Sequence, residues 1–271
     1  MIDPAPILHW RPTLSLGWLI ALLVWENWRP CFALFGCSEE RGRHGLRNVA
    51  LSLINVLMVS LLFAGAWSSI AAWSANHSIG VLHWLPLGGF LHAVFALLAL
   101  DFWTYAWHRI CHQVPMLWKF HAVHHADRCM DVTTSNRFHM VEIFLSSLLR
   151  IPLIALVGVH FGELVLYETV LQVCVQWQHA NIRIPADWER RISAVLITPG
   201  LHKVHHSNLQ PETDSNYSSL LSIWDRWMGT RCVREDLERI QFGIDGEPES
   251  APNAETLSGL IRRPFGAKAA E

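Results

Sequence analysis

Residues 48–100 read NVALSLINVLMVSLLFAGAWSSIAAWSANHSIGVLHWLPLGGFLHAVFALLAL and contain no Asp, Glu, Lys or Arg. This run is longer than a buried core helix needs, and it suits membrane spans, which take about 20 apolar residues each. We predict one span over Val49–Trp73. A second runs from about Pro86 to Trp107, a length of roughly 33 Å at the helical rise, close to the thickness of the bilayer core. The segment SANHSIG (residues 74–80) predicts a short turn between them.

The flanking sequence extends the same pattern. Leu14–Trp28 is a shorter apolar segment that we expect to end at Arg29 and Pro30. Val141–Val175 is apolar but contains charged residues, proline and glycine, so we predict a helical hairpin that bends near residues 157–162. Charged residues make up 16% of the chain, whereas soluble domains contain about 25%. The sequence therefore predicts an integral membrane helical bundle with about four to five membrane helices or hairpin segments.

Nine of the 16 histidines form a spaced pattern. Histidines at i, i+3 and i+4 share one helix face, with Cβ atoms roughly 5–6 Å apart, so each cluster can direct two or three imidazoles toward one point. Neutral imidazole suits iron, zinc, copper or nickel. Nine nitrogens exceed the ligand number of one ion, so the pattern predicts two metal ions with four or five nitrogens each. The nine are His108, His112, His121, His124, His125, His179, His202, His205 and His206.

His179 has the weakest local signal of the nine, because it stands alone in QHANI. Six other histidines lie outside the pattern, and we expect them to be interfacial or core residues: His9, His44, His77, His83, His92 and His160. His139, in RFHMVE, fits either a residue that orients a ligand or a plain interface residue.

Imidazole ligands need partners for their second ring nitrogen, which orient the ring. Four carboxylates are candidates for this role, with ordinary surface or capping positions as the alternative: Asp101, Asp127, Glu142 and Asp225. The six cysteines form no C-x-x-C pair, so we expect reduced structural residues and no disulfide framework.

The basic residues are distributed unevenly between the predicted loops. Residues 27–47 include Arg29, Arg41, Arg43 and Arg47, whereas residues 74–85 include neither Lys nor Arg. The positive-inside rule therefore places the first loop in the cytoplasm. Counting the spans forward, Trp107 emerges on that side and the hairpin returns the chain to it near His179. This topology places all the motif histidines on one face, the cytoplasmic one.

Three parts are predicted along the chain. These are N-terminal membrane helices over residues 1–85, a histidine-box catalytic domain over residues 86–242 and a polar, flexible C-terminal tail over residues 243–271. The tail includes GIDGEPESAPNAET, a composition typical of flexible linkers. The first residues, MIDPAPILHWRPT, lack a basic region followed by a small-residue cleavage site, so no cleaved signal peptide is expected.

With these motifs in place, the stretch from about Asp101 to Thr230 resembles the fatty acid hydroxylase superfamily, also called the sterol desaturase family, and within it the bacterial membrane branch. The resemblance rests on HRICH (108–112), HAVHH (121–125), RFHMVE (137–142), QHANIRIP (178–185), TPGLHKVHH (198–206) and NYSSLLSIWDRWMGT (216–230). Two positions depart from the family pattern. Met140 stands where proline is frequent, and Trp227-Met228 alters the segment usually written WD-x-x-FGT.

The resemblance implies an all-α membrane fold with a cytosolic cap and a di-iron centre that uses O2 as co-substrate. It carries the ligand role onto all nine histidines of the pattern. The implied function is a di-iron membrane oxygenase that hydroxylates or desaturates a lipid-like substrate, such as a fatty acyl chain, a sterol, an alkyl ether or a carotenoid. The implied location is a bacterial inner membrane.

Electrons for such a reaction must come from outside, because no G-x-G-x-x-G or other nucleotide-binding signature is present. We therefore expect a ferredoxin or cytochrome partner. Seven basic residues are candidates for its docking surface, with positive-inside bias near lipid headgroups as the alternative: Arg109, Lys119, Arg128, Arg137, Arg190, Arg191 and Lys203. The net charge is near zero, so nothing indicates a nucleic-acid partner.

Three other functions compete with this one. A membrane zinc hydrolase needs only three protein ligands and a water, fewer than nine histidines supply. A non-catalytic haem or electron-transfer protein would pair histidines within its spans, whereas these lie at and beyond the span ends. A metal transporter would place polar residues inside the spans, and Val49–Trp73 offers almost none.

Overall fold

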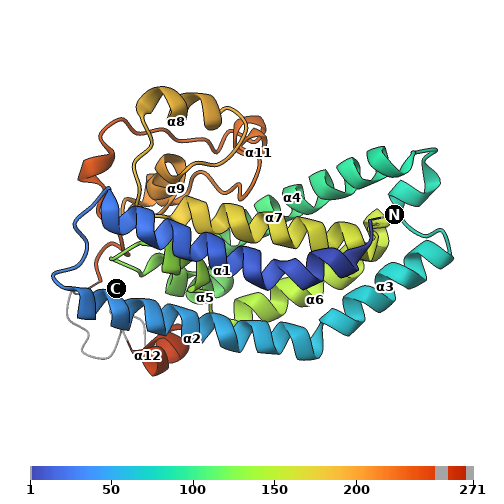
Figure 1. Cartoon of the computed structure of the whole chain (residues 1–271), viewed down its shortest axis with the longest axis horizontal. Coiled ribbons are helices and arrows are strands. Elements are labelled where there is room, and N and C mark those ends of the chain that lie inside the picture. The colour runs from blue at the N-terminus through green and yellow to red at the C-terminus, as the bar shows by residue number, and fades with distance from the viewer. Residues whose placement is uncertain (1, 248–255, 267–271) are drawn as a thin grey trace.

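The computed structural model describes residues 2–247 and 256–266, and these residues form helices and no β-strand (Figure 1). The long helices are α1 (Pro4–Trp28), α2 (Ser38–Leu62), α3 (Ala64–Asn76), α4 (Gly89–Gln113), α6 (Met140–Val157) and α7 (Phe161–His179). The shorter ones are α5 (Pro115–His125), α8 (Ala186–Ile192), α9 (Pro199–His205), α10 (Gln210–Thr213), α11 (Ile223–Trp227) and α12 (Leu257–Arg262). Four 3₁₀ turns complete the structure: η1 (Val81–Trp84), η2 (Val132–Asn136), η3 (Leu237–Arg239) and η4 (Arg263–Phe265). The predicted all-α fold is confirmed.

Among the described residues, four helices are long and apolar enough to cross a membrane, namely α1, α2, α4 and α6. Large apolar side chains on them point away from the rest of the protein, including Leu16, Leu53 and Phe90, which are 58%, 64% and 80% exposed. Exposing such an apolar surface to water would be unfavourable, whereas the hydrocarbon tails of lipids can surround it without that cost. The chain is therefore an integral membrane protein.

The helices differ from the predicted spans at their ends. α1 begins ten residues before Leu14, at Pro4, because the Asp3 side chain caps it by accepting a hydrogen bond from the Ala5 N–H (3.0 Å). The predicted span Val49–Trp73 is divided into α2 and α3 at Phe63, whose backbone φ of −120° leaves the helical region. Packing explains the break, since the Phe63 ring lies edge-to-face on Phe144 of α6 (5.3 Å between centroids).

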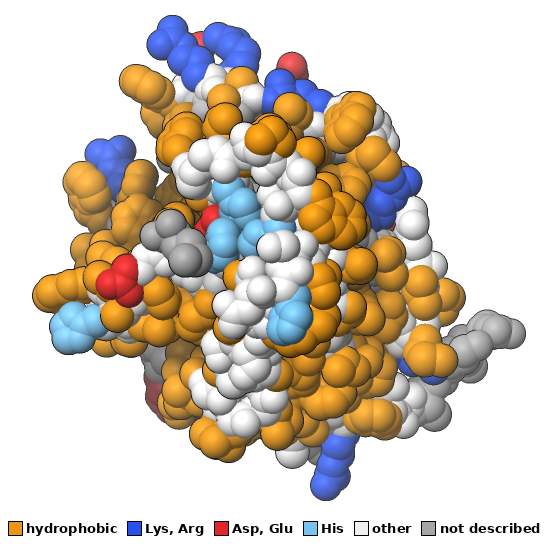
Figure 2. All heavy atoms as spheres, turned by 90° about the vertical axis from the view of Figure 1, so that its right-hand side faces the viewer, with side chains coloured by type: hydrophobic (Ala, Val, Ile, Leu, Met, Phe, Trp, Pro, Cys, Tyr) orange, Lys and Arg blue, Asp and Glu red, His pale blue; other side chains and the backbone are white. Residues whose placement is uncertain are grey.

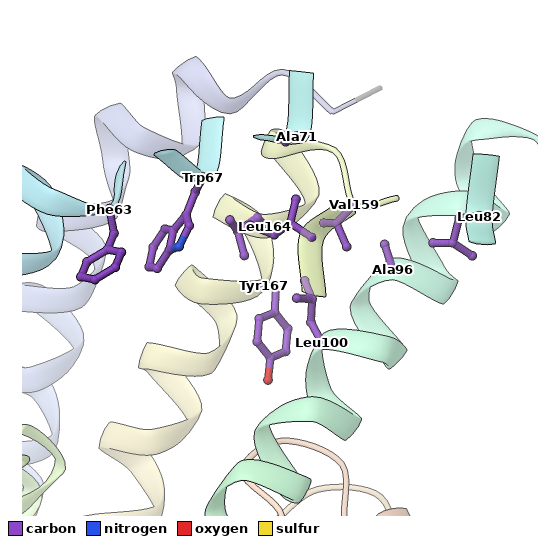
Figure 3. Close-up of a cluster of buried hydrophobic side chains, with 10 residues drawn as sticks. Phe63, Trp67, Ala71, Leu82, Ala96, Leu100, Val159, Leu164 and Tyr167 are labelled. Carbon is purple, nitrogen blue, oxygen red and sulfur yellow. The ribbon is translucent and has the colours of Figure 1, made fainter. Parts of the chain in front are cut away.

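A core of buried apolar side chains joins α3, η1, α4 and α7 (Figure 3). Tyr167 on α7 is fully buried in it and donates a hydrogen bond to Thr104 Oγ1 on α4 (2.7 Å). This hydrogen bond satisfies the hydroxyl, the one polar group of the tyrosine side chain. The ring therefore packs in the core without the free-energy cost of a buried donor that has no acceptor. This core holds α4, whose last turns carry His108 and His112, at a set position relative to α7.

The predicted hairpin over residues 141–175 is confirmed. α6 ends at Val157 and α7 begins at Phe161. Gly158 adopts a left-handed conformation (φ +85°), which ends α6 in the manner of a glycine C-cap. α7 is not among the four apolar spans, and an ion pair between Arg150 on α6 and Glu168 on α7 joins the two helices.

The cap and the N-terminus lie at opposite ends of the bundle (Figure 1). α8, α9 and α11 form the cap next to the C-terminal end of α7, where the first loop also lies: the Cys31 N–H donates to the Asn181 carbonyl (2.9 Å). The arginine-rich loop and the histidine-bearing cap therefore share one end of the bundle, as the sequence predicted.

The predicted flexible tail, residues 243–271, is partly helical. α12 and η4 lie within it, and Leu260 of α12 is fully buried against Leu51 and Val123. This apolar contact holds α12 against the bundle, although the polar sequence that precedes it predicted a flexible linker. Residues 248–255 and 267–271 of the predicted tail lie outside the described residues.

Candidate metal centre

All nine histidines of the sequence pattern gather in two adjacent groups. The five-histidine group consists of His108, His112, His121, His125 and His205, and the four-histidine group of His124, His179, His202 and His206. Within each group, the potential ligand atoms all lie within 4.8 Å of one another. The rings of His125 and His206 stack across the two groups with centroids 4.4 Å apart.

The two H-x-x-H-H motifs are divided between the groups in opposite ways. On α5, the i,i+4 pair His121 and His125 belongs to the five-histidine group, and the middle histidine belongs to the other. On α9 and its C-cap, the i,i+4 pair His202 and His206 belongs to the four-histidine group, and His205 to the other. Residues at i and i+4 differ by only about 40° around a helix, whereas adjacent residues differ by about 100°. Each motif therefore serves two neighbouring sites at once.

Backbone carbonyls set the protonation of three of the rings. Nδ1 of His108 lies 2.7 Å from the Tyr217 carbonyl, that of His179 2.7 Å from Val175, and that of His205 2.7 Å from Ser215. A carbonyl oxygen only accepts hydrogen bonds, so Nδ1 carries the proton in each case. The Nε2 atoms then present lone pairs to the interior of the groups.

Several Nε2 atoms lie so close together that their lone pairs would repel one another in the absence of a cation. Nε2 of His108 is 3.1 Å from that of His121 and 3.0 Å from that of His205. Nε2 of His179 is likewise 3.0 Å from those of His124 and His202. Lone pairs facing one another repel, whereas two nitrogens bound at right angles about 2.1 Å from one ion lie about 3.0 Å apart. Both groups therefore fit a divalent transition-metal ion.

Burial keeps the rings neutral. It lowers the pKa of His179 to about 4 and, despite a favourable carbonyl contact, that of His205 to about 3. Burial and neighbouring imidazoles also lower the pKa well below its ordinary value for His124, His125, His202 and His206. Neutral imidazole is the form that binds metal, so these residues need not lose a proton at pH 7 to become ligands.

One predicted carboxylate contacts a histidine of the groups directly. Glu142, on the first turn of α6, accepts a hydrogen bond from His121 Nδ1 (2.8 Å). Asp225 acts one step further away, because it accepts the backbone N–H groups of Tyr217 (2.8 Å) and Ser218 (3.0 Å). It thereby shapes the loop whose Tyr217 carbonyl holds His108.

The other two candidate carboxylates do not touch the nine histidines. Asp101 accepts the indole N–H of Trp224 (2.6 Å) and ties α4 to α11. Asp127 accepts from His44 at 2.9 Å and from the Thr134 hydroxyl at 2.7 Å. Both are buried, so neither is a surface carboxylate and neither orients one of the nine imidazoles. Asp127 does cap a turn, because it accepts the Cys129 N–H (3.1 Å).

Sequence reasoning missed the carbonyl partners and Asp214, whose carboxylate oxygen lies 3.4 Å from His112 Nδ1. The carbonyls could not have been found, because every residue has one and only the fold selects it. Asp214 follows His206 by eight residues, and its acidic side chain in the segment TDSNY was the one available signal.

Two predicted docking residues are buried. Arg137 and Lys203 are 0% and 1% exposed, so their assignment to an electron-donor surface is wrong. The Lys203 ammonium donates to the carbonyls of Ala180 (2.7 Å) and Ile182 (3.2 Å), which fastens α9 to the end of α7. Of the other five residues, Lys119, Arg190 and Arg191 are exposed, and Arg109 and Arg128 are half-buried.

The histidines outside the pattern have different surroundings. His139 caps α6 by accepting from the Val141 N–H (3.2 Å), and its Nε2 lies 3.0 Å from the Ile261 carbonyl of α12. It is thus an interface residue. His44 is buried against Asp127, whereas His9 and His77 are exposed. His92 is buried and His83 and His160 are half-buried, and the three lie together in a third cluster.

Replacing Glu142 by Ala should weaken metal binding by roughly 10–100-fold, the range measured when the partner of a metal-bound imidazole is removed. The His121 ring would lose the acceptor that sets its tautomer and direction. Glu142→Gln, which keeps an acceptor oxygen, should recover part of the affinity. Metal release to a competing chelator measures both values, and Glu39→Ala, which removes an exposed carboxylate of α2, is the matched control. Equal metal affinity in Glu142→Ala and the control would contradict the orienting role.

Comparison with known proteins identifies relatives of this chain. A family model described as fatty acid hydroxylase matches residues 93–230, a range that contains all nine histidines. An ornithine lipid hydroxylase of Rhizobium tropici is 32% identical over 155 residues, which cover 57% of this chain and 46% of that protein. Human alkylglycerol monooxygenase is 28% identical over 154 residues, covering 55% and 32% of the two chains. Human cholesterol 25-hydroxylase is 25% identical over 142 residues, covering 51% and 50%.

The chain thus spans half or less of the length of these curated relatives. No solved structure matches it. The family model covers more than half of the chain, and it covers the helices that carry the two histidine groups as well as the loop that holds His108. The chain therefore belongs to the fatty acid hydroxylase family, as its histidine motifs predicted.

Proposed function

We propose that this protein is an O2-dependent membrane oxygenase that hydroxylates or desaturates a lipid-like substrate with two iron ions bound by its nine histidines. One observation carries the proposal: two adjacent, buried groups of five and four histidines, in which imidazole nitrogens face one another at 3.0–3.1 Å. The names of the relatives, a lipid hydroxylase, an alkylglycerol monooxygenase and a cholesterol hydroxylase, support an oxidation of lipids.

Iron is preferred to zinc because zinc has no redox chemistry, whereas a hydroxylation needs a metal that reduces O2. When bound, the two ions would supply the oxidation of an unactivated C–H bond. The chain itself keeps the imidazoles neutral through burial, directs their Nε2 atoms inward through the carbonyl contacts, and keeps bulk water away from the groups. Such preorganised, water-poor surroundings are what the protein contributes to metal-based oxidations.

The position of the groups supports a substrate that arrives from the bilayer. His108 and His112 lie on the last two turns of α4, a membrane span. α11 lies beside that span, since Trp224 contacts Phe102 edge-to-face (5.2 Å between centroids). Trp227 of α11 is 73% exposed next to this contact, as is typical of aromatic residues at a membrane interface. An amphiphilic lipid could therefore reach the groups along this side of α4.

The orientation and the electron donor are part of the proposal. The arginine-rich loop and the cap lie at the same end of the bundle, and the positive-inside rule then favours a cytoplasmic cap, in a bacterial inner membrane. A ferredoxin or cytochrome would supply electrons there, with Lys119, Arg190 and Arg191 as exposed docking residues. We also retain as a proposal the division into N-terminal membrane helices (1–85) and a catalytic domain (86–242).

Anaerobic purification followed by metal quantification and assay with a lipid panel tests the function. We expect about two iron ions per chain, and product only when both O2 and a reductant are added. With ¹⁸O2, a hydroxylated product should carry the label, whereas desaturation yields an unlabelled alkene that still requires O2. A product whose new oxygen comes from water, formed without O2 or reductant, would establish a hydrolase and end the proposal.

A further inference from the structure

A third histidine cluster lies at the end of the bundle opposite the cap. It consists of His83, His92 and His160, and its potential ligand atoms all lie within 4.8 Å of one another. We call it the far-end cluster. The three residues come from η1, the first turn of α4 and the α6–α7 turn. This end of the bundle faces the viewer in Figure 2, where histidine side chains gather near the centre beside an acidic side chain.

Two glycines bring the segments of the far-end cluster into direct contact. A Cβ atom at Gly80 would lie 2.4 Å from the backbone nitrogen of Gly158, and one at Gly158 would lie 2.9 Å from Cδ2 of His83. Both glycines have positive φ, at +113° and +85°. Side chains at these positions would therefore force the two turns apart and displace the His83 ring. Glycine at both positions allows His83 to lie against the α6–α7 turn.

A buried carboxylate orients two of the three rings. Glu163 Oε1 lies 2.8 Å from His92 Nδ1 and 3.2 Å from His160 Nδ1. An ionised carboxylate only accepts, so Nδ1 of His92 carries a proton, and in the neutral ring its Nε2 is left with a lone pair. A carboxylate on the rear nitrogen of an imidazole is the usual arrangement behind a metal-bound histidine.

Two of the three Nε2 atoms in the far-end cluster lack a hydrogen-bond partner among the described residues. Nε2 of His83 and Nε2 of His92 are buried and form no hydrogen bond with any described residue. His92 is only 6% exposed. The rings of His92 and His160 lie 4.3 Å apart between centroids, and those of His83 and His160 5.1 Å. Buried imidazole nitrogens without partners are costly, and an ion bound between them would remove that cost.

We propose that the far-end cluster binds one divalent transition-metal ion, zinc, through His83, His92 and His160, with Glu163 holding the rings in place. Three imidazoles and one further position, open to water, match the zinc coordination of proteins. Tetrahedral nitrogens about 2.1 Å from zinc lie about 3.4 Å apart. The potential ligand atoms lie within 4.8 Å of one another, so the rings would move closer together when the ion binds. The half-buried rings of His83 and His160 leave a path for the ion from the aqueous phase.

The site is separate from the nine-histidine centre. A bound ion would join η1 and the start of α4 to the α6–α7 turn, which lies far from them in the sequence. Because an ion that binds only the folded state stabilises it, thermal stability should rise with the free zinc concentration. The proposal does not depend on which reaction the nine histidines support.

Zinc binding to iron-loaded protein in detergent tests the proposal. The wild-type chain should bind one zinc ion more than the His83→Ala/His160→Ala double variant at a free zinc concentration set by a chelator, and the affinity of the double variant should be at least 100-fold lower. Thermal unfolding should shift upward with zinc in the wild type and not in the double variant. His77→Ala removes an exposed histidine at the same end of the bundle and should behave as the wild type.

Iron content reports whether the double variant is folded, because it measures the nine-histidine centre independently. If the double variant does not fold, X-ray absorption at the zinc edge of the wild type decides instead, and three nitrogen ligands per zinc are expected. Equal zinc stoichiometry in the wild type and the folded double variant would overturn the proposal. So would zinc in the wild type that is bound without nitrogen ligands, or the absence of any zinc beyond the iron-loaded centre.

Discussion

His124→Ala should abolish oxidation and reduce the bound metal from about two ions per chain toward one. His124 belongs to the four-histidine group, and its Nε2 lies 3.0 Å from that of His179. Removing it leaves three nitrogens in that group and all five in the other. Removing the hydrogen-bond partner of a metal-bound imidazole lowers activity by up to roughly 100-fold. Removing a ligand itself should have a larger effect, so we expect activity to fall by well over that factor.

Metal analysis and lipid oxidation, measured on the same preparation, check this result. His9→Ala is the control, because His9 is exposed on α1 and outside all three clusters. Membrane insertion should be unchanged in both variants, since α5 is not among the four apolar spans. A His124→Ala protein that keeps both metals and its activity would show that the four-histidine group is not a metal site.

Asp127→Ala should lower the free energy of unfolding by about 3–5 kcal/mol, the range for removing one member of a buried ionic network. Asp127 is 1% exposed and accepts from His44 (2.9 Å), the Thr134 hydroxyl (2.7 Å) and the Cys129 N–H (3.1 Å). The Arg137 guanidinium lies 3.8 Å away and is fully buried. Without the carboxylate, this positive group and several donors would remain in the interior.

The pH dependence has a definite sign. His44 and Arg137 hold the pKa of Asp127 well below its usual range despite the opposing effect of burial. A carboxyl whose folded-state pKa is lowered stabilises the protein fully above its unfolded value of about 3.9 and loses that contribution as the pH falls below it. The difference between wild type and Asp127→Ala should therefore be full at pH 7 and shrink below about pH 4.

Thermal unfolding in one detergent measures the effect, which should amount to a decrease of about 6–20 °C in Tm. Asp187→Ala is the control, because the Asp187 side chain is 77% exposed in its pair with Arg190. A surface change of this kind should alter stability by no more than about 0.5 kcal/mol. An Asp127→Ala protein as stable as the Asp187→Ala protein would mean that the buried network contributes nothing net.

The membrane helices and the identity of the nine clustered histidines were predictable from the sequence. Hydropathy over a span and the i, i+3, i+4 spacing of the motifs are local properties, and they hold wherever the helices are placed. The same locality explains the errors. A charge-free run does not reveal that packing of Phe63 on Phe144 divides it, and a polar composition does not reveal that Leu260 is buried.

Only the tertiary structure decided which histidines belong to the five-histidine group and which to the four-histidine group. Each H-x-x-H-H motif could have served one ion, and the crossing of α5, α7 and α9 instead distributes the rings into groups of five and four. Arg137 and Lys203 were candidates for a docking surface because they are basic, yet both lie in the interior. His83 and His160 are 77 residues apart and meet only because two glycines let their turns touch. Contacts between distant segments depend on the relative position of whole helices, which no local pattern encodes.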